Sequence, residues 1–185
     1  MNANTKNMLR ILIVDDEALA RRGLKHRLRS ISDTEIVAEA RNGREALEHI
    51  RKLNPDLVFL DIQMPGMGGF EVVAELSRET MPAIVFVTAF DEYAIKAFES
   101  NALDYLLNPI EDSRLHEALN RVRDLMEQKK AMMHKKSLLK LLGDITGEPV
   151  TNMKDLSAKG VKKMKRMEVS KLGIKDGGKT TWVPQ

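Results

Sequence analysis

The sequence predicts an α/β protein built on a doubly wound sheet of five parallel strands with five helices, followed by an extended helix, a linker and a β-type fragment. Short apolar runs rich in β-branched residues alternate with helical stretches between residues 9 and 127. The runs LVFL and AIVFV lack in–out alternation, as expected for strands that helices cover on both faces. Alternating strands and helices form parallel sheets with right-handed crossovers.

The individual elements follow from apolar spacing and from breaker residues. Strands are predicted at residues 9–14, 35–38, 57–60, 83–87 and 103–107, and helices at 17–30, 44–53, 70–76, around 94–98 and from 111 onward. In the first helix, Leu19, Leu24 and Leu28 recur near helical spacing and form the expected buried stripe. Breaks at Asn42-Gly43 and Asn54-Pro55 bound the second helix.

The last helix is predicted to continue past the sheet and to stop at Gly143. Leu115, Leu119 and Val122 begin a seam at coiled-coil-like spacing, which lysines interrupt and leucines between 138 and 142 resume. We assign the part before residue 127 to packing on the sheet, with a dimer-forming helix as the alternative.

Charge changes sharply along the chain. Residues 1–128 carry 16 Lys and Arg against 22 Asp and Glu, whereas residues 129–185 carry 14 against 5. A shift of this size indicates a boundary near residue 128. A basic tail fits either a nucleic-acid contact or a solvated linker, and composition leaves both open.

We therefore expect three segments. Residues 8–127 form the α/β domain, residues 128–165 a basic helical extension and linker, and residues 166–185 the start of a second, truncated domain. Within the last segment, Asp176-Gly177-Gly178 between β-forming residues predicts a hairpin turn. One hairpin is too small to form its own core.

Composition also excludes several classes of protein. The chain has no cysteine, which rules out disulfides and cysteine-ligated zinc and is compatible with a reducing cytoplasm. Its longest apolar stretches have about five residues, against roughly 20 for a membrane span. The N-terminal MNANTKNMLR lacks the apolar core of a signal peptide. We expect a cytoplasmic protein that does not contact a membrane.

Polar residues follow the predicted strands directly. Asp15-Asp16, Asp61, Thr88 and Asn108 stand at or just beyond the ends of four apolar runs. In a parallel sheet these ends share one edge, where ligands bind. Three converging carboxylates repel one another and attract a hard divalent cation such as Mg²⁺. The alternative for Asp15 or Asp16 is that it only caps the following helix.

The blocks ILIVDDE, LVFLDIQMPGMGGFE, VFVTAFDEYA and DYLLNPI, in this order and spacing, resemble the receiver domain of two-component response regulators. The resemblance covers about residues 8–127 and implies a doubly wound sheet of order 2-1-3-4-5. It makes Asp61 the phosphoacceptor, and it makes Asp16, Asp61 and the backbone carbonyl of Gln63 direct Mg²⁺ ligands. Asp15 would bind the ion mostly through water.

The same resemblance assigns the remaining site residues. Thr88 would donate a hydrogen bond to the phosphoryl group, and Tyr105 would be the switch aromatic that turns inward when Thr88 moves. Asn108 departs from the family, which has lysine before this proline. Because a lysine ammonium would pair with Asp61 and then with a phosphoryl oxygen, we expect Asn108 to weaken coupling between phosphorylation and switching.

Two further stretches resemble one subfamily. TAFDEYAIKAFESNALDYLL is similar to receivers joined to a LytTR-type (LytR/AlgR) DNA-binding domain, and LGIKDGGKTTWVP is similar to the first strands of that mostly β domain. The resemblance implies a truncation within the DNA-binding domain, with specific DNA binding only in the full-length protein.

We accordingly expect a response regulator rather than an enzyme with an external substrate. A sensor histidine kinase would phosphorylate Asp61, and the output would be a homodimer through residues 91–123 that regulates transcription. The alternative is a phosphate-independent interaction module, favoured by Asn108. A metal-dependent phosphohydrolase fits less well, because such enzymes usually need an acid–base residue where Gln63 stands.

Overall fold

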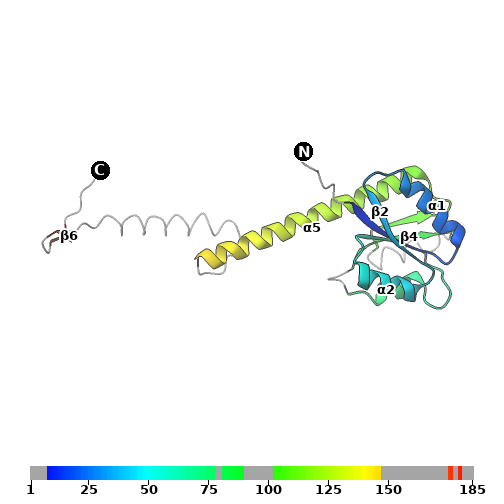
Figure 1. Ribbon diagram of the computed structural model, residues 1–185, viewed down its shortest axis with the longest axis horizontal. Coiled ribbons are helices and arrows are strands. Elements are labelled where there is room, and N and C mark those ends of the chain that lie inside the picture. The colour runs from blue at the N-terminus through cyan, green and yellow to red at the C-terminus, as the bar shows by residue number, and fades with distance from the viewer. Residues whose placement is uncertain (1–7, 78–80, 90–101, 147–174, 177–178, 181–185) are drawn as a thin grey trace. The chain divides into compact units, whose positions relative to one another are not determined.

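A computed structural model describes residues 8–77, 81–89, 102–146, 175–176 and 179–180 (Figure 1). The chain divides into two compact units, Met1–Met126 and Glu127–Gln185. The strands are β1 (Leu9–Val14), β2 (Thr34–Ala40), β3 (Leu57–Leu60), β4 (Ala83–Thr88), β5 (Asp104–Leu107), β6 (Lys175–Asp176) and β7 (Lys179–Thr180). The helices are α1 (Ala18–Arg29), α2 (Gly43–Leu53), α3 (Gly69–Ala74) and α5 (Asp112–Thr146).

The first unit contains a five-stranded, all-parallel sheet of order β2-β1-β3-β4-β5, which confirms the predicted fold class. Every residue of the central strands β3 and β4 is buried, in agreement with their uninterrupted apolar sequences. The register places Val14 opposite Leu60 and Leu60 opposite Phe86. Because three neighbouring strands end nearly level, the residues that follow them meet at one edge.

Helices cover the sheet on both faces (Figure 1). On one face, Leu24 of α1 and Leu119 of α5 belong to a buried cluster with alternate strand residues such as Ile13. On the other face, Ile50 of α2 and Val72 of α3 join the remaining strand residues in a second cluster. Successive side chains of a strand point to opposite faces, so each strand contributes to both clusters.

The limits of α2 follow the predicted breaks. Asn42 occupies the N-cap, where its side-chain oxygen accepts a hydrogen bond of 2.9 Å from the Glu45 N–H. The Glu45 carboxylate accepts in turn from the Arg41 N–H at 2.9 Å, so the two side chains satisfy free donors at the helix start. Asn54 ends the helix in the left-handed region, with φ of 46°.

Two predictions about the helices are wrong. Leu19 is 79% exposed, because the five residues to Leu24 turn a helix by about 140° and place the two on different faces. Arg21 instead shares the buried stripe with Leu24 and Leu28. Helix α5 does not stop at Gly143 but continues to Thr146, since an interior glycine costs a helix only about 1 kcal/mol.

Other predictions concern the rest of the chain. The predicted helix around 94–98 lies outside the described residues. Strands β6 and β7 pair antiparallel, with Asp176 opposite Lys179, as a hairpin requires.

The boundary between the two compact units, after residue 126, lies close to the predicted charge boundary. The division into three segments otherwise stays a prediction. Within the described residues no helix is long and apolar enough to cross a bilayer.

Candidate functional site

Three carboxylates meet at the carboxyl edge of the sheet. Asp15 and Asp16 follow β1 and Asp61 follows β3, and one oxygen of each lies within 4.8 Å of the others. The Asp61 N–H donates to the Val14 carbonyl at 2.9 Å, and the Asp15 N–H donates to the Ala40 carbonyl at 3.2 Å. Backbone pairing therefore continues one residue beyond the strands and fixes where these side chains begin.

The environment of Asp15 disfavours its charged form. Burial raises the pKa of Asp15 to about 6, although a hydrogen bond from the Glu17 N–H opposes the rise, and the charges of Asp61, Asp16 and Glu17 add to it. The Glu17 N–H donates to the Asp15 carboxylate at 2.7 Å. Glu17 itself occupies the N-cap of α1, so neither aspartate takes that position and the capping alternative does not explain the pair.

Asp61 is perturbed in the same direction. Burial raises its pKa, whereas the backbone N–H groups of Ile62 and Gln63 and the nearby Thr88 hydroxyl favour the carboxylate. The Ile62 N–H donates to Asp61 at 2.8 Å. A half-buried carboxylate that lies close to other carboxylates is stabilised in its charged form by a bound cation.

Thr88 ends β4 beside Asp61 and is 2% exposed. Its hydroxyl lies close enough to favour the charged form of Asp61, yet within the described part of the chain it makes no hydrogen bond of normal geometry. A buried hydroxyl without a partner costs about 1–3 kcal/mol. This group is therefore ready to donate to a ligand that brings its own acceptor oxygens.

The donor set fits a hard divalent cation. All three side chains offer carboxylate oxygens, which are the ligands that Mg²⁺ prefers. No lysine or arginine among the described residues forms an ion pair with Asp15, Asp16 or Asp61. Arg21, the only buried cation among the described residues, donates to backbone carbonyls instead. The carboxylates thus keep their oxygens available for a metal.

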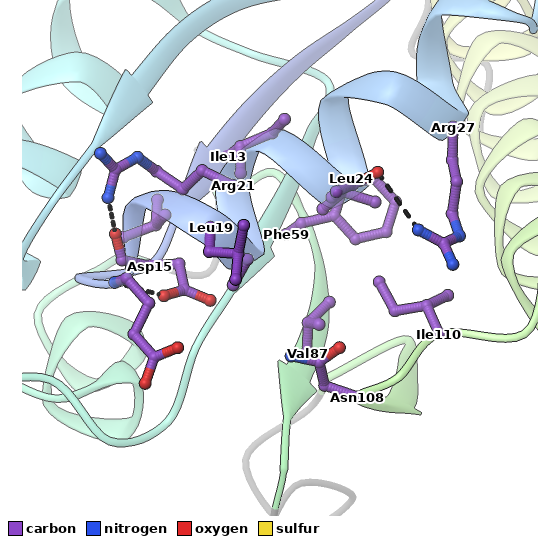
Figure 2. A pocket seen from close by; sticks show the side chains of 14 residues that line it. Ile13, Asp15, Leu19, Arg21, Leu24, Arg27, Phe59, Val87, Asn108 and Ile110 are labelled. Atoms are coloured by element: carbon purple, nitrogen blue, oxygen red, sulfur yellow. Dashed lines mark hydrogen bonds between the residues drawn. The ribbon is translucent and has the colours of Figure 1, made fainter.

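The remaining predicted residues border this edge. Asn108 follows β5, its N–H donates to the Thr88 carbonyl at 2.8 Å, and the Asn108–Pro109 peptide bond is cis. Asn108 and Asp15 line the same cavity of about 190 Å³ beneath α1 (Figure 2). Tyr105 lies on β5 opposite Phe86 and is partly buried against the second cluster. The roles of Tyr105 and of the Gln63 carbonyl stay predictions.

Sequence reasoning missed two residues that shape the site. Arg21 donates from α1 to the carbonyls of Asp15 and Asp16, at 2.7 and 3.2 Å. The sequence did contain a sign of this role, because Arg21 lies at helical spacing from Leu24 and Leu28 and so places a charged residue on the apolar stripe of the helix. At Gly69, a Cβ atom would lie 2.5 Å from the Asp61 carbonyl oxygen, so the loop after Asp61 closes only over a glycine.

Comparison with known families agrees with this geometry. The family model described as the response regulator receiver domain matches residues 11–120, a span that contains the three carboxylates, Thr88 and Asn108. The chain belongs to the response regulator receiver domain family. The predicted resemblance is therefore confirmed at the level of the receiver domain.

Curated relatives carry related names. The transcriptional regulatory protein BtsR of Salmonella typhi is 56% identical over 116 residues, which are 63% of this chain and 48% of that protein. An uncharacterized response regulatory protein of Yersinia pestis is 55% identical over 120 residues, 64% of this chain and 50% of that protein. The chain thus spans about half the length of the curated relatives it matches.

Solved structures show the same fold. The response regulatory domain of protein mrkE from Klebsiella pneumoniae is 34% identical with a TM-score of 0.58, covering 64% of this chain and 98% of that one. The REC domain of AraT from Geobacillus stearothermophilus is 35% identical with a TM-score of 0.60, covering 66% of this chain and 98% of that one. This chain therefore contains the receiver domain of a two-component response regulator.

Proposed function

We propose that this receiver accepts a phosphoryl group on Asp61 from a sensor histidine kinase and thereby controls dimerisation and transcription by the whole protein. One observation carries the proposal. Asp61 lies within 4.8 Å of two further carboxylates and beside the buried, unpartnered hydroxyl of Thr88. Cation ligands and a free hydrogen-bond donor near one carboxylate suit an incoming phosphoryl group.

The chemistry is an in-line displacement at phosphorus. An oxygen of Asp61 forms a bond to phosphorus while the phosphorus–nitrogen bond of the kinase phosphohistidine breaks, and the released imidazole takes a proton from water. The Thr88 hydroxyl donates to a phosphoryl oxygen. Water later attacks phosphorus, the bond from phosphorus to the Asp61 oxygen breaks, and inorganic phosphate leaves while Asp61 returns to the carboxylate. The receiver thus catalyses its own phosphorylation and dephosphorylation and turns over no external substrate.

The cofactor of this proposal is Mg²⁺, held by Asp15, Asp16, Asp61 and the backbone carbonyl of Gln63. When bound, the ion neutralises the charge that gathers on the phosphoryl oxygens. The three side chains supply the carboxylate oxygens, and because burial raises the pKa values of Asp15 and Asp61, a bound cation would stabilise their charged forms.

For the output, we propose a homodimer through residues 91–123, of which 91–101 lie outside the described residues. Tyr105 and the 47% exposed Leu107 share β5, so an inward turn of the tyrosine would change a surface next to an exposed apolar side chain. Tyr105 would follow Thr88, which pairs with Leu107 in the neighbouring strand.

We further propose that the whole protein is a cytoplasmic transcription regulator with a LytTR-type DNA-binding domain beginning near residue 166. The name of the BtsR relatives supports transcriptional regulation, and the antiparallel strands β6 and β7 agree with a β-type start. Specific DNA contacts would belong to the whole protein.

Asn108 sets the efficiency of this site. A lysine here would place a cation beside Asp61 and form charge-assisted hydrogen bonds, worth roughly 1.5–3 kcal/mol, whereas an asparagine amide is neutral and shorter. We expect Asn108→Lys to increase phosphoryl uptake or phosphate-dependent dimerisation, measured by intact mass and by light scattering. If Asn108→Lys changes neither phosphoryl uptake nor dimerisation, Asn108 does not weaken the coupling between them.

A second candidate function rests on the same residue. With asparagine at position 108, the receiver would serve as an interaction module that binds partners without phosphate. Its prediction differs clearly, because Asp61→Asn would then leave partner binding and dimerisation unchanged.

Intact mass spectrometry separates the two. The chain and its Asp61→Asn variant are incubated with Mg²⁺ and a small-molecule phosphodonor, with EDTA as the metal-free control. We expect one phosphate-sized mass gain that requires both Mg²⁺ and Asp61. A gain that persists in Asp61→Asn would contradict the phosphoacceptor proposal by placing the phosphate on another residue. No gain while Mg²⁺ still binds would contradict it as well and would favour the interaction module.

A further inference from the structure

Arg21 is a buried cation within the apolar stripe of α1. It is 9% exposed and lies on the helix face of Leu24 and Leu28. Charged side chains are almost never buried this far without partners. The partners of Arg21 therefore indicate why an arginine occupies a position that packing alone would give to leucine.

The guanidinium of Arg21 holds the loop that carries two of the carboxylates. Its Nη1 group donates to the Asp15 carbonyl at 2.7 Å, a contact drawn in Figure 2, and to the Asp16 carbonyl at 3.2 Å. Its Nε lies 3.5 Å from the Glu39 carboxylate, an ion pair without a hydrogen bond. Glu39 also pairs with Lys25, whose hydrogen bond lowers the pKa of Glu39.

This arrangement opposes a specific tendency of the metal-free loop. Three carboxylates within 4.8 Å repel one another, and a loop free to move would relax by spreading them apart. Arg21 donates to the main-chain carbonyls of Asp15 and Asp16 and forms no ion pair with their carboxylates. It therefore restrains the loop and leaves the carboxylates free of a side-chain cation. The side-chain oxygens stay directed at one another and open to a cation.

We infer that Arg21 is a positioning residue for the magnesium site, which it preorganises through the carbonyls of Asp15 and Asp16. The inference rests on the proposed function, because it concerns the same metal. Groups that orient metal ligands without touching the metal change metal affinity by about 10- to 100-fold when they are replaced. Arg21 would orient the ligands in the same way, but through hydrogen bonds to the main chain of the loop rather than to a ligand side chain.

Isothermal titration of the full chain with Mg²⁺ tests this role. Arg21→Met should raise the Mg²⁺ dissociation constant by about 10- to 100-fold. Arg21→Lys keeps the charge but loses the planar fork that reaches several acceptors, and it should show a smaller increase. Arg22→Met, on the exposed side of the same helix, and Glu39→Gln, which leaves both carbonyl contacts in place, should bind Mg²⁺ as the unaltered chain does.

A second readout separates positioning from loss of stability. Phosphoryl uptake by Arg21→Met should fall at limiting Mg²⁺ and recover at saturating Mg²⁺. Because Mg²⁺ also stabilises the folded state, far-UV circular dichroism in EDTA must show that the metal-free variant is folded. If Arg21→Met does not fold, Arg21→Lys carries the test.

Three results would overturn the inference. A folded Arg21 variant with unchanged Mg²⁺ affinity would reduce Arg21 to a structural residue. An equal loss in Glu39→Gln would mean that the ion pair, not the carbonyl contacts, matters. Absence of Mg²⁺ binding by the unaltered chain would overturn the proposed metal site as well, whereas the first two results leave that site standing.

Discussion

Replacing Asp15 with asparagine removes one negative charge from the three carboxylates while keeping the shape of the side chain. The Asp15 side-chain oxygen that accepts the 2.7 Å hydrogen bond from the Glu17 N–H is retained as an amide oxygen. The change therefore isolates the cost of charge in this cluster. We expect the metal-free variant to be more stable than the unaltered protein at neutral pH.

The magnitude follows from the pKa of Asp15, which burial and neighbouring charges raise from 3.8 to about 6. At about 1.4 kcal/mol for each pKa unit, ionising this group at neutral pH costs the folded state about 3 kcal/mol more than the unfolded state. Asp15 keeps some contact with water, and screening reduces the expected gain for Asp15→Asn to about 1–2 kcal/mol.

The same pKa fixes a pH dependence. Between about pH 4 and about pH 6 the folded state binds more protons than the unfolded state, because its Asp15 pKa is the higher one. The stability that the protonated group contributes is thus lost as pH rises through this window, and the curve flattens above it. Asp15→Asn should reduce this slope and leave the part that the raised pKa of Asp61 contributes. Mg²⁺ should stabilise the unaltered protein more than the variant.

Urea unfolding in EDTA, followed by far-UV circular dichroism at several pH values, measures these free energies of unfolding. An Asp15→Asn variant that is less stable than the unaltered protein at neutral pH would refute the reasoning. An unchanged slope between about pH 4 and about pH 6 would refute it as well, since the titrating group would then lie elsewhere.

Three other substitutions, and one control substitution, probe different parts of the receiver. Thr88→Val removes a buried, unpartnered hydroxyl, so urea titration should show stability unchanged or raised by up to about 1 kcal/mol, while intact mass shows reduced phosphoryl uptake by Asp61. Gly69→Ala should cost about 1–3 kcal/mol and slow uptake, because its Cβ would lie 2.5 Å from the Asp61 carbonyl oxygen. Gly23→Ala, whose Cβ would meet nothing closer than 3.8 Å, is the matched control and should keep uptake unchanged. Leu119→Ala creates a cavity at a fully buried position and should cost about 2–5 kcal/mol in urea titration, with the folded protein still phosphorylated at saturating Mg²⁺.

The strands show how far sequence patterns reach. Both ends of β3 (Leu57–Leu60) were predictable, because an uninterrupted apolar run between Asp56 and Asp61 has few other solutions. In β1 (Leu9–Val14), which Arg10 interrupts, the polar pair that follows Val14 made the end predictable. The edge strand β2 (Thr34–Ala40) is longer than predicted, since its half-exposed residues leave a weak pattern. Gly143 misled the prediction of the end of α5, because propensity costs little beside the many hydrogen bonds of a long helix.

The site separates into a part fixed by topology and a part fixed by packing. The convergence of Asp15 and Asp61 follows from strand order alone, since neighbouring parallel strands end at one edge. Strand order does not predict the role of Arg21. This residue contacts main-chain carbonyls, and a sequence motif, which consists of side chains, does not reveal such contacts. The pKa of Asp15 likewise depends on burial that only the packed loop establishes.

The central claim is that Asp61 forms the acyl phosphate. Treatment of the phosphorylated chain with borohydride, which reduces an aspartyl phosphate to homoserine, followed by peptide mass mapping, identifies the modified residue directly. We predict homoserine at position 61 only, dependent on Mg²⁺ and absent from Asp61→Asn. Homoserine at Asp15 or Asp16, or no reduction product after a confirmed phosphate-sized mass gain, would contradict the account.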